Sequence, residues 1–333
     1  MLRETGLWQD VRELPQALAA TLDARDGVSD VAALLAREGV RRVVASGNGA
    51  AYYVAVALWL ASLEGRRGPE VVAVPSGLLA RGSFRWREGD VLLAVSSSGE
   101  FRDLVEAVEA GAPRPYAAIT ANAGSTLGSS AGARTLVAVP HQRAVTHTQA
   151  FCGAVAAVLA VWSEATGDRG LAAALAAAPD GVEGVLPAAE AWAQEAGADD
   201  AQAAIAFGSG PGWAAALEAA LLLEEVAGVP AEGVETREGA TSAMMALQPG
   251  HLAVSLPVAD AADPLLDEAE EVCRERGALV LRAPAAGGDR RLAAIATFPA
   301  AALLAARVGL ARGLDVDRPA WTDAYYRVAR QAT

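Results

Sequence analysis

Residues 91–100 read Val-Leu-Leu-Ala-Val-Ser-Ser-Ser-Gly-Glu, an apolar run followed by three serines, a glycine and a glutamate. A short apolar run that ends at turn residues is typical of a buried strand in a parallel sheet. Residues 101–110 then place apolar side chains at helical spacing. The serines are therefore expected at a strand-to-helix turn, where free backbone N–H groups and the helix dipole attract an oxyanion.

Two interpretations of Ser96, Ser97 and Ser98 are open. Serine is a preferred N-cap residue, so these side chains could simply cap the following helix. Three consecutive hydroxyls after an all-apolar strand favour the other interpretation, a site for a phosphate group. We therefore predict a phosphate-binding loop that consists of these serines and Gly99.

Strand and helix patterns alternate over the rest of the chain. The predicted strands lie at 42–45, 71–74, 91–95, 117–120 and 135–139, and the scheme restarts at 203–207 and ends with a strand at 295–298 and a helix at 300–310. Gly47-Asn48-Gly49 and Gly208-Ser209-Gly210 follow the first strand of each half. The halves therefore resemble copies, and the predicted fold is α/β with two tandem domains, each a parallel sheet flanked by helices.

The chain has 333 residues, more than one hydrophobic core usually organises. The predicted parts are an N-terminal helix at 1–25, a first domain at 26–165, a helical linker at 166–200, a second domain at 201–320 and a C-terminal tail at 321–333. The second half reads Leu-Pro-Val-Ala-Asp at 256–260, where the first half has its serines. A phosphate is therefore expected in the first domain only.

A net charge of −13 argues against binding to nucleic acid or to an anionic membrane. The apolar stretch at 151–162 is too short to span a bilayer, and the N-terminus lacks the features of a signal peptide, so a cytoplasmic protein is expected. Cys152 and Cys273 have neither metal-ligand nor disulfide spacing. No metal and no cofactor are expected, and a chain without lysine cannot form a Schiff base on a side-chain amine.

Residues 96–103, Ser-Ser-Ser-Gly-Glu-Phe-Arg-Asp, resemble the phosphate loop Ser-Gln-Ser-Gly-Glu-Thr-x-Asp of the double sugar-isomerase-domain (SIS) family. This family includes the isomerase half of glucosamine-6-phosphate synthase and its stand-alone relatives, and the resemblance extends over nearly the whole chain. It implies flavodoxin-like domains, a sugar phosphate held by the serines, and a homodimer. Phe101 replaces the family's threonine, which removes one hydrogen-bond donor.

Two more segments carry the resemblance on the ligand side. The turn at 46–49, Ser-Gly-Asn-Gly, is similar to the family's Gly-Thr-Ser turn, which implies that Gly47, Asn48 and Gly49 contact the sugar. Residues 145–151, Val-Thr-His-Thr-Gln-Ala-Phe, are similar to the family's Val-Ala-Ser-Thr-Lys-Ala-Phe. The residues that this second likeness places beside the phosphate are Val145, His147 and Thr148.

Gln149 stands where that segment has its lysine. A partly protonated His147 could supply the missing charge, because a histidine of ordinary pKa titrates near neutrality. His147 could equally be a solvent-facing residue at the start of a helix. The sequence leaves both interpretations open.

Residues 217–227, Leu-Glu-Ala-Ala-Leu-Leu-Leu-Glu-Glu-Val-Ala, are similar to the family's Leu-Glu-Gly-Ala-Leu-Lys-Leu-Lys-Glu-Ile-Ser. The likeness implies that Glu225 moves a proton between C1 and C2 of the sugar. On a largely apolar helix that faces a closed cleft, such a carboxyl is expected to have a pKa raised toward neutrality, as a general base needs. Without the resemblance, Glu224 and Glu225 are the polar face of an amphipathic helix.

The family's ring-opening histidine is missing from this chain. Residues 231–240 stand where the family has Glu-x-Lys/Arg-His-Gly-Pro, and a three-residue shift decides whether Glu238 or Thr241 takes the place of the histidine. Glu238 could transfer protons on a ring hydroxyl, because a buried carboxyl can be tuned to act near pH 7.

These features predict an enzyme that isomerises, or deaminates with isomerisation, a hexose or amino-sugar 6-phosphate. A deglycase of fructosamine-type 6-phosphates is an alternative with the same proton transfer. A phosphosugar sensor without catalysis is the third possibility, favoured by the missing lysine and histidine, whereas Glu225 and Glu238 favour the enzyme. Glutamine-dependent synthesis is not expected, because no glutaminase domain precedes the first helix.

Overall fold

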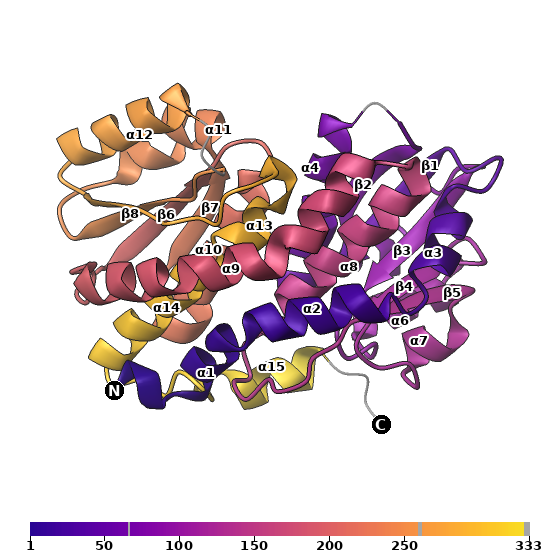
Figure 1. Cartoon of the computed structure of the whole chain (residues 1–333), viewed down its shortest axis with the longest axis horizontal. Coiled ribbons are helices and arrows are strands. Elements are labelled where there is room, and N and C mark those ends of the chain that lie inside the picture. The colour runs from indigo at the N-terminus through magenta and orange to yellow at the C-terminus, as the bar shows by residue number, and fades with distance from the viewer. Residues whose placement is uncertain (66, 259–261, 330–333) are drawn as a thin grey trace. The chain divides into compact units, whose positions relative to one another are not determined.

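The computed structural model describes residues 1–65, 67–258 and 262–329. It contains two parallel sheets, each with helices packed against it (Figure 1). The strand order is β2-β1-β3-β4-β5 in the first sheet and β7-β6-β8-β9 in the second. The predicted α/β class with parallel sheets is therefore confirmed, and the first four strands of both sheets follow the same order.

The first sheet consists of β1 (Arg42–Gly47), β2 (Glu70–Pro75), β3 (Asp90–Val95), β4 (Ala117–Thr120) and β5 (Ala133–Leu136). The helices of this part of the chain are α2 (Leu14–Ala24), α3 (Val28–Leu35), α4 (Ala50–Glu64), α5 (Ser76–Ala80), α6 (Arg102–Glu109), α7 (Thr126–Ser130) and α8 (Gln149–Thr166). Every residue of β1 is buried, as expected of a central parallel strand.

The second sheet consists of β6 (Ala203–Gly208), β7 (Ala231–Glu235), β8 (His251–Ser255) and β9 (Leu279–Arg282). The remaining helices are α1 (Gly6–Arg12), α9 (Arg169–Glu195), α10 (Gly212–Ala227), α11 (Thr236–Thr241), α12 (Pro264–Glu275), α13 (Ala293–Ala296), α14 (Phe298–Ala311) and α15 (Thr322–Ala329). Short 3₁₀ turns lie at Leu2–Glu4, Ala243–Ala246 and Arg290–Leu292.

The residues group into two compact units. The first-sheet unit comprises residues 17–140 and 150–176 and the chain from Thr322; the second-sheet unit comprises residues 1–16, 141–149 and 177–321. Residues 141–149 therefore belong with the second sheet, although they lie between β5 and α8 in the chain. The five predicted parts with their boundaries stay a prediction.

Each sheet has a glycine at which the chain turns sharply from its first strand into a helix. A Cβ on Gly47 would lie 2.4 Å from the carbonyl carbon of Ala51, and a Cβ on Gly208 would lie 2.0 Å from the carbonyl oxygen of Gly212. In both cases the helix backbone approaches too closely for any side chain. The two glycine turns that the sequence singled out therefore share one local geometry.

Three sequence predictions were wrong in detail. The predicted strand at 295–298 is helical, with α13 followed by α14, because a short apolar run does not distinguish a buried strand from a buried helix. Pro299 lies in the first turn of α14, where proline favours a helix start. The strand predicted at 135–139 lies at Ala133–Leu136, and the predicted N-terminal helix is interrupted at Glu13.

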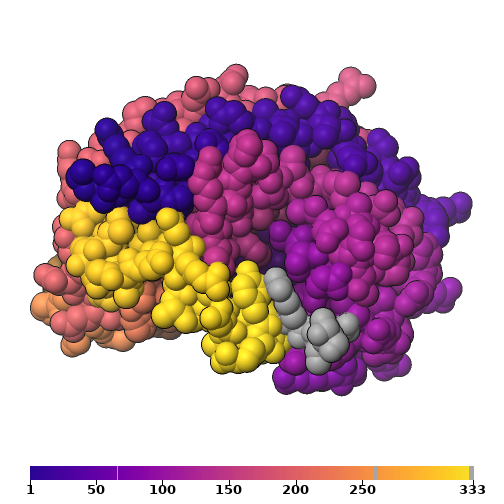
Figure 2. Space-filling view, turned by 90° about the horizontal axis from the view of Figure 1, so that it is seen from below, coloured from indigo at the N-terminus to yellow at the C-terminus, as the bar shows by residue number. Residues whose placement is uncertain are grey.

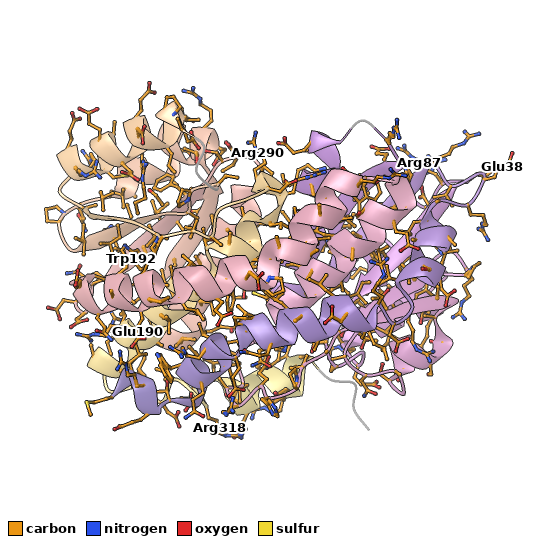
Figure 3. All side chains as sticks on the ribbon, viewed as in Figure 1. Glu38, Arg87, Glu190, Trp192, Arg290 and Arg318 are labelled. Carbon is orange, nitrogen blue, oxygen red and sulfur yellow. The ribbon has the colours of Figure 1, made fainter. Side chains whose placement is uncertain are left out.

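The linker region is a continuous 27-residue helix, α9, although it contains Pro179 and Pro187. Figure 3 shows Glu190 and Trp192 on this helix. Glu190 is mostly buried and forms an ion pair with Arg3, which fixes the N-terminal segment to α9. The C-terminal helix α15 exposes Tyr325 and Val328, and the C-terminal part of the chain is visible at the surface in Figure 2.

Two helical segments, 149–166 and 290–311, are long and apolar enough to cross a bilayer. This corrects the expectation drawn from residues 151–162 alone. The most apolar 18-residue window of each segment is mostly buried in the protein, to 83% and 94%, and the buried core helices of globular proteins have the same composition. Length and hydropathy therefore give only weak support for a membrane span.

Candidate functional site

The predicted phosphate loop follows β3, the direct neighbour of β1. The two strands pair in parallel from Arg42 beside Asp90 to Ser46 beside Ala94. The loops after them, 47–49 and 96–99, thus leave the same edge of the sheet. In the order β2-β1-β3 the chain reverses direction across the sheet at β1, and open α/β folds bind ligands at such a switch point.

Hydrogen bonds fix the serine loop internally. The Gly99 amide donates to Ser96 Oγ (3.1 Å), and the Glu100 amide donates to Ser98 Oγ (3.2 Å). The Glu100 carboxylate accepts from the Thr126 amide (2.8 Å) and hydroxyl (2.7 Å) at the start of α7. Gly99 has φ of +69°, and a Cβ there would lie 1.9 Å from Ser125 Oγ, so this position requires glycine.

The N-cap residue of α6 is Phe101, and no side chain caps this helix. The hydroxyls of Ser96 and Ser98 thus accept hydrogen bonds from amides of the loop itself and do not cap α6, contrary to the capping interpretation. An uncapped helix start keeps its first N–H groups and its partial positive charge available to an anion.

Sequence reasoning missed two hydroxyls at this edge. Ser46, at the end of β1, and Ser76, directly after β2, are fully buried. Neither Oγ has a hydrogen-bond partner within the described chain. Such buried unpaired groups are rare in proteins. The sequence signal for Ser46 was a serine near the end of an apolar strand. The sequence analysis named this residue only as part of the glycine turn at 46–49.

Residues 141–149 are anchored in the second-sheet unit by Asp10. Its carboxylate accepts from the Arg143 and Ala144 amides (both 2.8 Å to Oδ2), and its carbonyl accepts from Gln149 Nε2 (3.1 Å). The Val145 amide donates to the Asp317 carbonyl (2.9 Å). Gln149 is therefore buried and hydrogen-bonded within the protein.

The hydroxyls of Thr146 and Thr148 in this segment are buried and have no hydrogen-bond partner in the described residues. His147 between them is partly buried. Burial lowers the pKa of His147, which disfavours the protonated form. This direction of the pKa shift works against a positive charge on His147, and the role of the residue stays a prediction.

Glu225 lies in the last turns of α10 and is partly buried, whereas Glu224 is exposed. Burial, followed by repulsion from Glu224, raises the pKa of Glu225 to about 7. The Glu225 carbonyl accepts a hydrogen bond from Trp321 Nε1 (2.7 Å), which fixes the end of the helix. A carboxyl that titrates near neutrality has the property of a general base.

Sequence reasoning also missed Glu218, two helical turns before Glu225. This residue is only 3% exposed, and its Oε2 has no hydrogen-bond partner in the described chain. Burial, and next the Glu225 carboxylate, raise the pKa of Glu218 well above its ordinary value. The signal in the sequence was the seven-residue spacing, which places both side chains on one helix face.

Glu238 and Thr241 lie on α11 and are both exposed. Glu238 Oε1 accepts a hydrogen bond from the Ser242 hydroxyl (3.0 Å). Glu235 caps this helix by accepting from the Arg237 amide (2.8 Å). Neither candidate for the position of the missing histidine is therefore buried, and the role of Glu238 stays a prediction.

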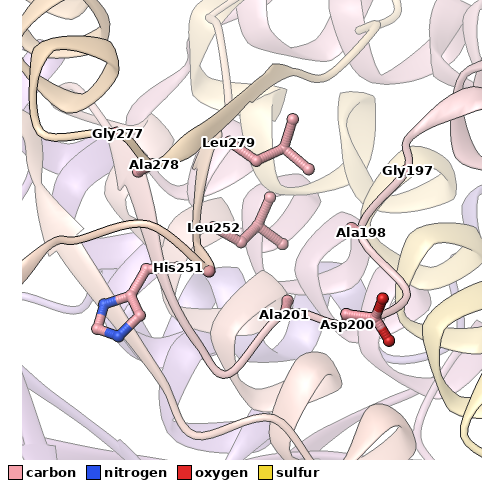
Figure 4. A pocket seen from close by; sticks show the side chains of 10 residues that line it. Gly197, Ala198, Asp200, Ala201, His251, Leu252, Gly277, Ala278 and Leu279 are labelled. Carbon is pink, nitrogen blue, oxygen red and sulfur yellow. The ribbon is translucent and has the colours of Figure 1, made fainter.

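A pocket of about 280 Å³ lies in the second-sheet unit at the amino ends of β8 and β9 (Figure 4). Its lining includes Asp200, His251, Leu252 and Leu279. None of the predicted site residues lines it. Because ligands of open α/β sheets bind at the carboxyl ends of strands, this pocket is not part of the candidate site.

No protein-family model matches the chain. It is 26% identical over 93% of its length to a glutamine–fructose-6-phosphate aminotransferase (isomerizing) of Aeropyrum pernix, of which it covers 55%. It is 28% identical over 95% of its length to the enzyme of the same name from Leifsonia xyli subsp. xyli, of which it covers 58%. The chain thus spans about half the length of these curated relatives.

Three solved structures share the fold. The C-terminal domain of glucosamine-fructose-6-phosphate aminotransferase from Francisella tularensis has a TM-score of 0.81 and 19% identity, covering 95% of this chain and 98% of its own. Tagatose-6-phosphate ketose/aldose isomerase from Escherichia coli has a TM-score of 0.79 and 18% identity, covering 95% and 96%. Glucosamine-6-phosphate deaminase from Thermotoga maritima has a TM-score of 0.75 and 16% identity, covering 95% and 98%. The chain is therefore a relative of isomerizing aminotransferases and has the fold of phosphosugar isomerases.

Proposed function

We propose that this protein is a phosphosugar isomerase-type enzyme that moves a proton between C1 and C2 of a hexose or amino-sugar 6-phosphate. The reaction is an aldose–ketose isomerisation or a deaminating isomerisation. The observation that carries the proposal is Glu225, a partly buried carboxyl with a pKa raised to about 7. The names of the relatives support this substrate class.

In the proposed binding mode the phosphate occupies the loop of Ser96, Ser97, Ser98 and Gly99. The uncapped start of α6 and the switch-point position of the loop support this role. The turn Gly47-Asn48-Gly49 contacts the sugar. Val145, His147 and Thr148 are further proposed ligand contacts.

In the proposed reaction Glu238 assists opening of the sugar ring. The Glu225 carboxylate then removes the proton on C2 of the aldose, the electron pair forms the C1–C2 double bond, and the carbonyl oxygen takes up a proton. Return of the proton to C1, with loss of the proton from the C2 hydroxyl, completes the ketose. An amino-sugar phosphate follows the same course through an enolamine, which becomes the C2 imine when C1 is protonated; water then hydrolyses this imine to the ketose and ammonia. Anchoring of the phosphate orients C1 and C2 against the base, which can contribute several kcal/mol.

The matching strand orders of the two sheets and the shared geometry of Gly47 and Gly208 support a duplicated, tandem SIS architecture. We propose 26–165 and 201–320 as the two SIS domains, and a cytoplasmic homodimer as the working form. Light scattering tests the assembly; a monomer at working concentration would contradict it.

The test of the reaction is incubation with fructose 6-phosphate or glucosamine 6-phosphate in deuterated water. We expect deuterium at C1 or C2, and a rate about 10²–10⁴-fold lower for Glu225→Gln, because a general base contributes that much. Glu224→Gln is the matched control: it changes the exposed neighbour and keeps the base. Equal exchange rates in Glu225→Gln and the wild type would reject Glu225 as the base.

A non-catalytic phosphosugar sensor is the second candidate function. It is favoured by the buried, structural Gln149 and by Leu222, which is fully buried where the similar family segment has a lysine. Saturable binding of a hexose phosphate without any deuterium uptake would identify the sensor. Release of the amine from a fructosamine 6-phosphate would instead identify the deglycase.

A further inference from the structure

We propose that Glu218 carries a proton in the working protein and is a positioning residue for Glu225, so that α10 presents one neutral carboxylic acid and one carboxylate. This inference rests on the proposed function of Glu225 as the base. It assigns a role to Glu218, which belongs neither to the proposed phosphate loop at 96–99 nor to the glycine turn at 47–49.

Burial is the first step of the argument. Glu218 is 3% exposed, and its Oε2 has no hydrogen-bond partner in the described chain. An ionised carboxylate with an unpaired oxygen in such a place is strongly unfavourable, so the group takes up a proton instead. A protonated carboxyl then has an O–H that can donate and an oxygen that can accept.

The second step is the lack of a neighbouring cation. Within its described residues α10 carries Glu218, Glu224 and Glu225 but no arginine or histidine. Leu222, one turn after Glu218, is fully buried and apolar. No charge on the helix itself therefore stabilises an ionised Glu218.

The elements packed on α10 do not supply a cation either. They are β6, β7, α13 and α14, whose described residues include a single basic side chain, Arg307 on α14. Arg307 pairs with Asp199 (2.8 Å). Glu232 and Glu235 on β7 add negative charge. Arg312, just after α14, donates to the carbonyls of Ala227 and Gly228 at the far end of α10.

Spacing is the third step. Glu218 and Glu225 are seven residues apart, about 10 Å along the axis, and lie on the same face of the helix. The Glu225 carboxylate raises the pKa of Glu218, so the proton leaves Glu225 first and stays on Glu218. Two interacting carboxyls of this kind lose their protons in two steps that belong to the pair.

The functional consequence is a defined working state. With Glu218 neutral, only Glu224 repels the Glu225 carboxylate, so Glu225 can ionise near neutral pH and accept a proton from the sugar. Loss of the second proton at higher pH would place an uncompensated charge in the core beside the base. Activity should therefore follow a bell-shaped pH profile, with Glu225 on the acid limb and Glu218 on the alkaline limb.

The experiment compares the wild type with Glu218→Gln and with Glu224→Gln as the control for loss of one carboxyl from α10. Glutamine imitates the neutral acid, so Glu218→Gln should keep the maximal exchange rate within about threefold and keep the acid limb, but lose the alkaline limb. Glu224→Gln should keep both limbs. An alkaline limb that persists in Glu218→Gln would overturn the proposal.

A readout independent of activity separates this inference from the proposed function. The infrared difference spectrum of wild type minus Glu218→Gln at neutral pH should show the C=O stretch of one protonated carboxyl, and Glu224→Gln should keep that band. A spectrum without the band would overturn the proposal even if exchange is observed. A band in a protein without exchange would support a protonated Glu218 and reject the enzyme.

Discussion

The two sheets share a strand order, but the helix after β3 and the helix after β8 begin differently. The helix after β3, α6, has Phe101 at its N-cap and no side-chain cap. The helix after β8, α12, is capped by Asp263, whose carboxylate accepts from the Leu266 amide (3.1 Å). The same contrast holds after β2 and β7, where α5 has no side-chain cap and Glu235 caps α11.

This difference shows how one topology can serve two purposes. A carboxylate at a helix start satisfies its N–H groups and its positive end from within the protein. At the end of β8 an internal anion thus occupies the place that an uncapped helix offers to a ligand. The contrast supports the proposal that the first sheet binds the phosphate. The prediction that the second domain binds no phosphate was drawn from residues 256–260. Of these, residues 259 and 260 lie outside the described residues.

The largest expected effect is the loss of stability with rising pH from the carboxyls of α10. The pKa of Glu225 rises from 4.5 to about 7 on folding, so its contribution is complete below pH 4.5 and is lost as the pH rises through 7. The loss should reach about 3 kcal/mol from this group. Urea unfolding at acid and alkaline pH should show it, and Glu225→Gln should flatten it. An equal slope in both proteins would contradict the burial of this carboxyl.

The next largest effect is expected from a substitution that gives α6 an aspartate at its N-cap, as α12 has. Phe101→Asp should weaken binding of a hexose phosphate on the order of 100-fold, because its carboxylate competes with the phosphate for the helix start and repels it. Phe101→Asn has the same shape without the charge and is the matched control. Calorimetric titration measures both variants. Equal affinities of the two would place the phosphate elsewhere.

Removal of the loop hydroxyls should have a similar or smaller effect. Ser96→Ala with Ser98→Ala should weaken sugar-phosphate binding by roughly 1–3 kcal/mol through lost hydrogen bonds to the anion. The corresponding control in the second-sheet unit is Ser209→Ala with Ser255→Ala, which should leave the affinity unchanged. Equal losses from both pairs would remove the distinction between the two sheets.

The smallest expected effect is on stability and comes from the Asp263 carboxylate at the start of α12. Asp263→Ala removes the cap of α12 and should cost about 1 kcal/mol of stability. Affinity for a hexose phosphate should not change, because α12 follows the strand that carries no phosphate loop. Thermal unfolding and a binding titration measure the two quantities. A change in affinity without a change in stability would reverse the assignment.

Local sequence patterns were sufficient for the α/β class, the place of the serine loop after β3 and the two glycine turns. Apolar runs ended by glycine and serine specify buried strands and tight turns through backbone sterics, which act over a few residues. The same patterns failed at 295–298, where an apolar run alone did not distinguish strand from helix.

Tertiary structure alone decided the rest. The unpaired hydroxyls of Ser46 and Ser76, the burial of Glu218 and the attachment of residues 141–149 to the second-sheet unit depend on segments far apart in the chain. The pKa of a carboxyl depends on what surrounds it, and no spacing within a helix reveals whether neighbouring elements bring a cation. Residue order therefore determined the elements and their turns, whereas packing determined which polar groups are left to act on a ligand.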